Sequence, residues 1–430
     1  MQENRKNSYY GWYIVLAASL ITLLTVGFRL GVGPFVIPMM KDLGISRTQF
    51  SLIAAVSALM YGLGMPLAGF LIKRYSTRSV LLVGMVIVCG SLIWTILAKS
   101  EGSLLLSFGI LLSIGLSFLS PVAMTPIISR WFVRQRGKAL FYLSSGSMAG
   151  IAIMTPLETM LIEAWGWHKT LWLFAGLFIV IVVPCALFVM RDDVPEGADR
   201  ENDAVKPDKT VKGIDGRSSV NNLSKVSEMT WRDAVGTKAY WQIVLGLFTC
   251  GFSMNLLGSQ GVPMLVDHHF DPMTASFGIG IIGIVAIFST LLLGSIADRY
   301  ERKIILFWIY LVRGLGFLGL VLAATPWQLY SVGVAGGLVW AGSTAMSSAI
   351  LSDLYGTKLL GLLYGWAYFG HQIGGAIGTF LGGWGYETFG THFFAFGLTT
   401  LLLLMASWIS YRLPARSSRW PMEEKGASLG

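Results

Sequence analysis

The sequence predicts an all-α membrane protein with twelve transmembrane helices, arranged as two pseudo-symmetric six-helix bundles. Three observations support this fold class: the composition, the length of the apolar runs, and a pattern that recurs in the second half of the chain. Of the 430 residues, 54% are hydrophobic and only 13% are charged, whereas an ordinary soluble domain carries roughly 25% charged residues. Apolar runs such as residues 79–98 and 393–409 are long enough to cross, as helices, a hydrocarbon core about 30 Å thick.

Twelve spans follow when the apolar runs are read between charged or turn-rich breaks. The predicted spans cover residues 12–39, 51–72, 79–98, 103–128, 139–161, 170–190, 240–266, 274–297, 304–324, 327–352, 361–386 and 393–411. An even number of spans places both termini on the same side of the membrane.

The distribution of Lys and Arg predicts which side that is. If the N terminus is inside, most of the 32 basic residues fall in inside segments and few fall in outside loops, which is the usual bias of cytoplasmic loops. The same bias explains the net charge of +9 without a nucleic-acid partner. We therefore expect a multi-pass protein of the plasma (inner) membrane with both termini in the cytoplasm.

One long polar stretch, residues 191–237, separates the first six spans from the last six. It is rich in charged residues and poor in aromatic residues, so it buries too little apolar surface to fold alone and is predicted to be a cytoplasmic linker. The predicted domains are an N-terminal bundle at 1–190, a C-terminal bundle at 238–411 and a cytoplasmic tail at 412–430.

The two bundles look like copies of one unit, because several residues recur at a nearly constant interval. The recurring pairs are Gly69 with Gly294, Arg74 with Arg299, Pro38 with Pro263, Asp42 with Asp267, Gly146 with Gly370, and Gly150 with Gly374. Parallel repeats of this kind place a substrate site near the bilayer midplane, at the interface between halves that rock around it.

The repeated motif resembles the signature of the major facilitator superfamily, Gly-x-x-x-Asp-Arg followed by basic residues, and the resemblance covers nearly all of the chain. The second copy matches the signature at Gly294, Asp298, Arg299, Arg302 and Lys303. The first copy has Lys73 in the acidic position and keeps Gly69, Arg74 and Arg78. The resemblance implies the major facilitator fold, alternating access, and cytoplasmic gating contacts at both copies.

Three further stretches resemble the monocarboxylate and oxalate carrier branch of the superfamily, especially its bacterial members. They are Tyr10-Gly11-Trp12 at the start of the first span, Gly27-Phe28-Arg29 through Gly33, and residues 131–139 running on to Gly146 and Gly150. That branch often carries an arginine with an acidic partner in its eighth helix, but residues 276–297 contain no charged side chain. The resemblance implies a transporter of a small organic anion, and the departure means that other residues have to hold the anion.

Arg29 is the first candidate for that role. It lies deep in the first span, where a charge costs at least ~2.5–3.5 kcal/mol on insertion scales and usually faces the bundle interior or a wet cavity. Gly27, Gly31 and Gly33 surround it and permit local unwinding that exposes backbone carbonyls. A guanidinium binds a carboxylate through two parallel hydrogen bonds and stays charged at any working pH. The competing interpretation is a structural arginine bonded to the opened carbonyls.

The eleventh span is predicted to supply a second part of the site. Tyr364, Tyr368 and His371 have i, i+4 and i+7 spacing and so share one helix face, with Gln372 beside them. His371 is a candidate proton carrier because histidine titrates near physiological pH; alternatively, it stays neutral and bonds Gln372 or a substrate oxygen. The opposite face carries a ridge of small residues that suits close helix packing, namely Gly370, Gly374, Gly378 and Gly382.

Five further candidate binding residues each have a packing alternative. Pseudo-symmetry places Asn255 and Gln260 opposite Arg29, where their amides would bind substrate oxygens or bond neighbouring helices. Tyr61, Tyr142 and Trp340 fall in helices that the superfamily resemblance places around the cavity. Aromatic residues at such positions more often pack than bind.

Two ionisable residues complete the set inside predicted spans. Glu158 is a second candidate proton carrier, although its expected position near the outer interface favours a solvated role. Arg313 lies about half-way along the ninth span and is expected to pack against a neighbouring helix, because it is too deep to reach either interface easily.

The first functional prediction is a secondary active transporter of a small organic anion, a mono- or dicarboxylate, by proton symport or anion exchange. The alternatives are an exporter of amphipathic compounds, favoured by the aromatic content and the uncharged eighth helix, and a transporter-like membrane sensor that signals through the linker. The sequence holds no metal-ligand motif, phosphate-binding loop or catalytic constellation, so we expect no enzyme activity, no cofactor and no metal. The expected partners are the lipid bilayer, the anion and, as a candidate coupling ion, the proton.

Single cysteines test the predicted topology. Asp271→Cys, in a predicted outside loop, should react with a membrane-impermeant maleimide on intact cells, whereas Ser218→Cys, in the linker, should react only after permeabilisation. The parent chain, whose cysteines lie inside apolar runs, is the control. Labelling of Ser218→Cys from outside intact cells would contradict the orientation.

Overall fold

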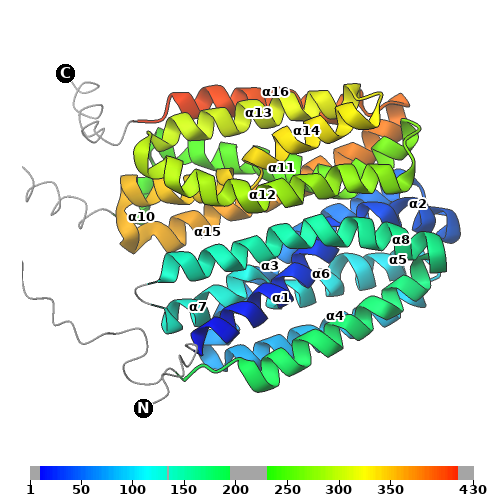
Figure 1. Ribbon diagram of the computed structural model, residues 1–430, viewed down its shortest axis with the longest axis horizontal. Coiled ribbons are helices and arrows are strands. Elements are labelled where there is room, and N and C mark those ends of the chain that lie inside the picture. Colours follow the sequence, from blue (N-terminus) through cyan, green and yellow to red (C-terminus); the bar gives the residue numbers. More distant parts are fainter. Residues whose placement is uncertain (1–9, 133–134, 194–229, 415–430) are drawn as a thin grey trace, which may run out of the picture.

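The computed structural model describes residues 10–132, 135–193 and 230–414, and within these ranges every regular element is a helix. Figure 1 shows two bodies of helices side by side, one built from each half of the chain. Helix α10 lies at one end of the molecule, together with the start of the first helix and the end of the last helix, and we call this end the α10 end. Helix α2 lies at the opposite end, which we call the α2 end.

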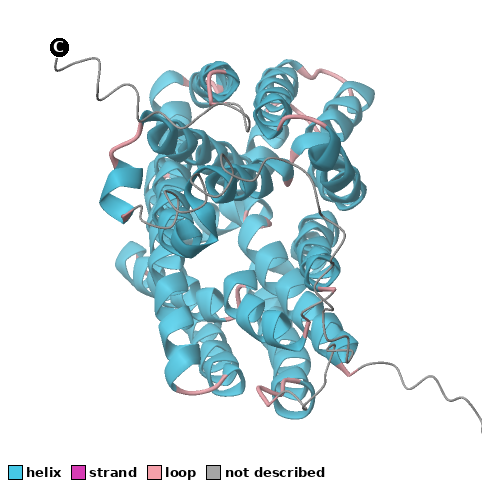
Figure 2. Ribbon diagram, turned by 90° about the vertical axis from the view of Figure 1, so that its left-hand side faces the viewer, coloured by secondary structure: helices cyan, strands magenta, loops and turns pink. Residues whose placement is uncertain are grey.

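The first body contains α1 (Gly11–Leu30), α2 (Gly33–Leu43), α3 (Arg47–Arg74), α4 (Thr77–Ile96), α5 (Glu101–Leu104), the π-helical stretch η1 (Leu105–Leu111), α6 (Leu112–Phe118), α7 (Pro121–Trp131), α8 (Arg136–Pro184) and the π-helical stretch η2 (Cys185–Val189). The second body contains α10 (Trp231–Val235), α11 (Lys238–Asp267), α12 (Pro272–Arg299), α13 (Arg302–Leu322), α14 (Pro326–Val339), α15 (Gly342–Phe389) and α16 (Phe393–Tyr411). Figure 2 views both bodies from the α10 end.

The predicted spans all fall on helices, and the helical membrane fold is confirmed. Ten helical runs in the described residues are long and apolar enough to cross a membrane. One of them, Arg136–Val189, contains two predicted spans, because α8 continues through a bend at Gly166, where φ is 78°. The predicted eleventh span lies in α15 beyond a similar bend at Gly356 and is not among the ten runs. The count of twelve therefore stays a prediction.

The first predicted span, residues 12–39, is interrupted. Helix α1 ends at Leu30 and α2 begins at Gly33, so Gly31 and Val32 form a break that the surrounding glycines had indicated. Pro34 stands in the first turn of α2, where its missing N–H costs no helical hydrogen bond. This break begins two residues after Arg29.

Glycines bring the first and fifth helices of each body into close contact. In the second body a Cβ added at Gly374 would collide with the backbone of α11 at Phe248, and one at Gly378 would lie 2.6 Å from the Phe252 carbonyl oxygen. In the first body the equivalent Gly146 approaches Ser19 of α1 in the same way. The glycine ridge predicted on the eleventh span therefore packs α15 against α11.

A matched pair of substitutions tests this packing. Gly374→Ala should destabilise the second body by about 1–3 kcal/mol, because the methyl group has no space against Phe248 and the two helices have to separate. Gly365→Ala, on the same helix with nothing within 4 Å of the new methyl group, should leave the melting temperature unchanged or raise it. Thermal unfolding in detergent measures both, and equal melting temperatures would contradict the packing argument.

The two bodies meet mainly through α3 against α15 and α8 against α12. Small residues line both contacts: Gly62 of α3 packs on Gln372 of α15, and Gly283 of α12 packs on the α8 backbone at Ala152. Thr159 of α8 also shares a hydrogen bond of 2.5 Å with Ser276 of α12. We call this α8–α12 contact the seam.

Polar side chains tie the bodies together at the α2 end, in a group that we call the α2-end lock: Arg47, Ser51, Gln260, Asp267 and His392. The buried Arg47 donates from Nη1 to Asp267 Oδ2 at 2.5 Å and from Nε to Gln260 Oε1 at 3.0 Å. The Gln260 amide in turn donates to Ser51 Oγ at 2.9 Å. Each of these bonds joins a residue of the first body to one of the second, so the lock closes the interface at this end.

Histidine and glutamate residues complete the closure. His392 Nε2 lies 2.9 Å from Asp267 Oδ2, and burial lowers the pKa of His392 below its ordinary value despite that carboxylate. A neutral imidazole therefore donates to Asp267 near neutral pH, and Arg47 supplies the positive charge of the lock. The Thr48 backbone N–H donates to Glu387 Oε2 at 2.8 Å, and the hydrogen bonds from Thr48 lower the pKa of that exposed carboxyl.

Removing the acid of the lock should open the α2 end. Asp267→Asn leaves a buried arginine without its anion, which costs about 1–3 kcal/mol or more and favours conformations in which the bodies separate here. Spin labels at the exposed positions Lys41 and Asp271, one on each body, should then show longer distances by pulsed electron paramagnetic resonance. Arg130→Gln, which breaks a pair inside the first body, is the control. An unchanged distance distribution in Asp267→Asn would show that the lock does not hold the closure.

Candidate functional site

Arg29 stands in the last turn of α1, at the point where the two bodies meet. Its Nη2 donates to Asn255 Oδ1 of α11 at 2.9 Å, and its Cζ lies 4.1 Å from the ring centroid of Tyr61 on α3. The guanidinium is thus held by an amide of the other body and by an aromatic face, and both partners are neutral. Among the described residues no carboxylate lies within ion-pair distance of Arg29.

The α15 residues lie next to this arginine cluster. Gly62, which follows Tyr61, packs directly on the Gln372 side chain. His371 Nδ1 lies 3.3 Å from Gln372 Oε1, and the Tyr368 ring stacks on the imidazole with centroids 4.8 Å apart and planes 5° apart. His371 is buried, and its Nε2 has no hydrogen bond to a described residue.

A small cavity of about 40 Å³ opens beside Arg29 and Asn255. Its other polar lining comes from Ser57 of α3, Ser259 of α11 and Thr379 of α15, and its apolar lining includes Phe28, Ala58 and Phe108. A volume of this size holds roughly three water molecules. Residues of both bodies line it, so its shape changes whenever the bodies move.

The structure brings together most of the binding residues expected from the sequence. Six lie in one connected cluster, and Tyr364 adjoins it with its ring 5.8 Å from that of Tyr368; the six are Arg29, Tyr61, Asn255, Tyr368, His371 and Gln372. Which of these residues contacts a substrate stays a prediction.

Three of the expected residues lie elsewhere. Gln260 belongs to the α2-end lock, with both ends of its amide engaged. Tyr142 is exposed on α8, with its ring 5.7 Å from that of Trp12 near the α10 end. Trp340 is 4% exposed and borders a narrow apolar gap with Leu30 and Met254 rather than the polar cavity.

Sequence reasoning missed three polar lining residues and the lock. Ser259 follows Asn255 by four positions and Thr379 follows Gln372 by seven, so helical spacing from residues already chosen would have found both. Arg47 gave no such signal, because an arginine at a span end reads as an ordinary loop charge. Its role depends on Asp267, far away in the sequence, and only the tertiary structure brings the two together.

Arg313 has the structural role that its position had suggested. It is completely buried and donates from Nη2 to the carbonyls of Val339 and Trp340, the former at 2.9 Å. Helix α14 ends at Val339 and α15 begins at Gly342, so these carbonyls lose helical partners at the break. Arg313 supplies those missing hydrogen bonds.

The expected solvated position of Glu158 is wrong. Its side chain is 0% exposed, and neither carboxyl oxygen has a hydrogen-bond partner among the described residues. The reason is tertiary: this part of α8 lies beneath the α1–α2 break, with a carboxyl oxygen directly against Gly31. The position of Glu158 along its predicted span did not indicate that the α1–α2 break covers its side chain.

The two signature copies lie at the α10 end, and the gating role expected there stays a prediction. In the second copy Arg302 donates to Asp353 Oδ2 at 2.6 Å and Lys303 pairs with Glu301 at 3.6 Å. Arg299, Arg74 and Arg78 are exposed, and a Cβ at Gly69 would meet nothing within 4 Å. The Asp298 side chain and the surroundings of Gly294 lie outside the described part.

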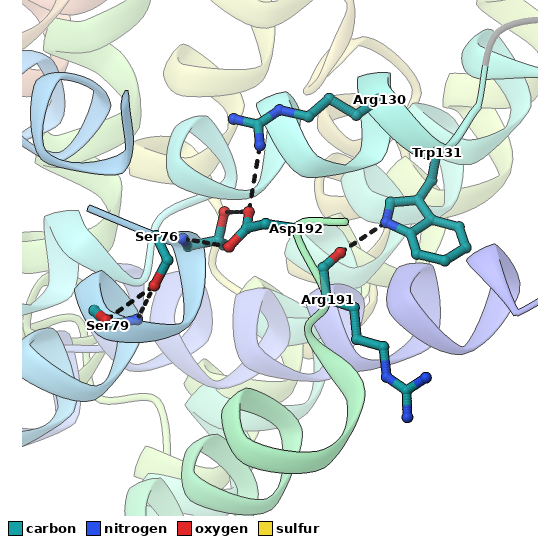
Figure 3. Close-up of polar contacts among 7 residues, drawn as sticks. Ser76, Ser79, Arg130, Trp131, Arg191 and Asp192 are labelled. Carbon is teal, nitrogen blue, oxygen red and sulfur yellow. Dashed lines mark hydrogen bonds and ion pairs between the residues drawn. The ribbon is translucent and has the colours of Figure 1, made fainter. Parts of the chain in front are cut away.

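Figure 3 shows how the first body ties its helices together at this end. Asp192, which follows η2, accepts hydrogen bonds from the Thr77 backbone N–H at 2.9 Å and from the Thr77 hydroxyl at 2.6 Å, and its Oδ1 lies 3.5 Å from Arg130 Nη1. Trp131 donates to the Arg191 carbonyl at 2.8 Å. The first signature copy has Lys73 where the signature has an acidic residue. At this end of the first body the carboxylate comes instead from Asp192, which follows the sixth predicted span.

Comparisons with known proteins agree with this architecture. A family model described as the Major Facilitator Superfamily matches residues 18–346 and 243–429. The uncharacterized MFS-type transporter YcxA of Bacillus subtilis (strain 168) is 28% identical over 381 residues, which cover 86% of this chain and 87% of the relative. Monocarboxylate transporter 12 of Rattus norvegicus is 22% identical over 417 residues, which cover 93% of this chain and 84% of the relative.

A solved structure supports the same fold. A bacterial homolog of the human lysosomal transporter Spinster, in an inward-facing and unoccupied conformation, superposes with a TM-score of 0.68 at 18% identity, covering 94% of this chain and 97% of that one. The two helical bodies, the site between them and a family match that spans nearly the whole sequence agree with the resemblance in the sequence motifs. This chain belongs to the major facilitator superfamily of membrane transporters.

Proposed function

We propose that this protein is a secondary active transporter that moves a small organic anion, a mono- or dicarboxylate, by alternating access of its two bodies. The observation that carries the proposal is Arg29: a cation at the junction of the bodies with no carboxylate partner among the described residues. A positive charge in a membrane interior requires compensation, and a carboxylate substrate supplies it.

The geometry around Arg29 suits a carboxylate. One guanidinium nitrogen donates to Asn255, and the other N–H groups have no hydrogen bond to described residues, so a planar pair of donors is available for two carboxylate oxygens. The Tyr61 ring beneath the guanidinium fixes its plane. Ser57, Ser259 and Thr379 line the adjoining cavity with hydroxyl groups that suit further substrate oxygens.

The size of the cavity and the relatives support a small substrate. A cavity of about 40 Å³ favours a short-chain acid over a bulky amphipathic compound. Several relatives carry the name monocarboxylate transporter at 22–28% identity. Because the eighth helix of this chain is uncharged, we assign the anion to the first helix, at Arg29.

In this proposal the α2 end faces the outside and the α10 end faces the cytoplasm, as the distribution of basic residues indicates. The α2-end lock is then the outer gate. The protein lies in the plasma membrane with both termini inside, and it works by proton symport or anion exchange.

An exporter of amphipathic compounds is the second candidate. The aromatic face of Tyr364, Tyr368 and Tyr61 beside the cluster favours it, since such surfaces bind apolar bodies. It differs from the first candidate in requiring no charge at position 29 for binding.

Substitution of Arg29 distinguishes the two candidates. Arg29→Gln should weaken binding of lactate or oxalate by about 2–5 kcal/mol, since a charge-assisted pair is lost from a desolvated site, while Arg29→Lys should recover only part of the affinity because an ammonium lacks the planar fork. Ligand-induced thermal shifts on purified protein measure both effects.

The exposed Arg136 supplies the control, because Arg136→Gln removes the same charge outside the site. A folded Arg29→Gln with unchanged carboxylate affinity would remove the anion-anchor role and favour the exporter. A purely structural arginine would lower the melting temperature of both Arg29 variants and leave the affinity of the folded fraction normal.

A further inference from the structure

Glu158 is a carboxyl group in the membrane interior that nothing in the anion site requires. It is fully buried in α8, and neither oxygen has a hydrogen-bond partner among the described residues. An ionised carboxylate in such a place loses its water and receives nothing in exchange, at a cost of several kcal/mol. The neutral, protonated form is the one compatible with these surroundings.

No described charge compensates Glu158. The elements packed against α8 are α1, α2, α4, α7, α12 and η2, and the ionisable group of η2 is the partly buried thiol of Cys185. Three ionisable side chains of these elements form polar contacts with partners other than Glu158. Arg29 donates to Asn255, Asp42 accepts from Trp167, and the Cys89 thiol contacts the Ala175 carbonyl. The others are exposed residues at helix ends, namely Lys41, Arg78, Arg130, Asp271 and Arg299, and the Asp298 side chain lies outside the described part.

The carboxyl lies against the α1–α2 break. A Cβ at Gly31 would collide with Glu158 Oε2 and would lie 3.0 Å from its carboxyl carbon. Gly31 follows Arg29 by two residues, and it is outside both helices. A movement of the last turn of α1 therefore changes the cover over Glu158.

Residues next to Glu158 on α8 form part of the seam between the bodies. Thr159 shares its hydroxyl hydrogen bond with Ser276 of α12, and Pro156 lies 3.2 Å from the position of a Cβ on Gly280. Separation of the bodies at the α2 end would break these contacts and expose the side of α8 beside Glu158 to water.

From this placement we propose that Glu158 is the proton-binding site of the transporter. Its carboxylate takes a proton from water when the seam opens, the closed seam then holds the resulting acid out of water, and movement of the α1–α2 break lets the proton leave toward the substrate cavity. The O–H bond of Glu158 forms when the seam opens, and the same bond breaks when the α1–α2 break moves. The proposal rests on the proposed function, because coupling requires an anion that binds at Arg29.

Transport in proteoliposomes tests the coupling. Glu158→Gln, which cannot titrate, should retain exchange of radiolabelled lactate across the membrane but lose accumulation driven by an inward proton gradient. Glu163→Gln, an exposed position on the same helix, should accumulate lactate as the parent chain does. Accumulation by Glu158→Gln would overturn the proposal. Loss of gradient-driven accumulation in His371→Gln with exchange retained would place the proton at His371 and would overturn it too.

A second measurement needs no substrate and separates this proposal from the proposed function. Infrared difference spectra between the parent chain and Glu158→Gln should contain the C=O stretch of a protonated carboxylic acid at neutral pH, whereas the Glu163→Gln difference should lack this band. Absence of the acid band would show that Glu158 is ionised and end the proposal, even if lactate transport is normal. If the parent chain moves no carboxylate but the acid band is present, the anion assignment fails and the proton site stands.

Discussion

The arrangement of this protein depends on the need to compensate one positive charge inside an apolar bundle. Arg29 is partly buried and lines the small cavity between the bodies, and its fixed partners are the Asn255 amide and the Tyr61 ring, both neutral. Because Asn255 belongs to the second body, the charge is properly surrounded only where the bodies meet. The site therefore forms at the interface of the bodies, and any motion of one body against the other alters it.

Close backbone approach makes such motion possible without loss of structure. Glycines pack α1 on α8 and α11 on α15 inside each body, so that each body is held by many short contacts. Between the bodies the contacts are fewer and more polar, as at the α2-end lock, where Asp267 keeps 22% of its side chain exposed. Water that enters there replaces the lost hydrogen bonds, which makes opening of this interface less costly than disruption of a body.

The break between α1 and α2 adjoins two ionisable groups. Arg29 precedes it and Glu158 lies beneath it, and neither side chain forms an ion pair with a described residue. Gly31 makes this close arrangement possible, because it leaves no room for a Cβ beside the carboxyl. A single local feature of the backbone thus lies next to both the candidate anion anchor and the buried acid.

The sequence by itself determined the membrane-embedded helical fold, the superfamily and the arginine at the centre of the site, because apolar run lengths, repeated motifs and a buried charge are all local signals. Helical spacing also predicted that Tyr364, Tyr368 and His371 would share a face of α15, and the rings of Tyr364 and His371 both lie next to that of Tyr368. Tertiary structure alone decided that Gln260 joins the lock, that Trp340 borders an apolar gap, and that Glu158 is buried. Those outcomes depend on which distant helix covers each side chain, and neither periodicity nor depth in a span contains that information.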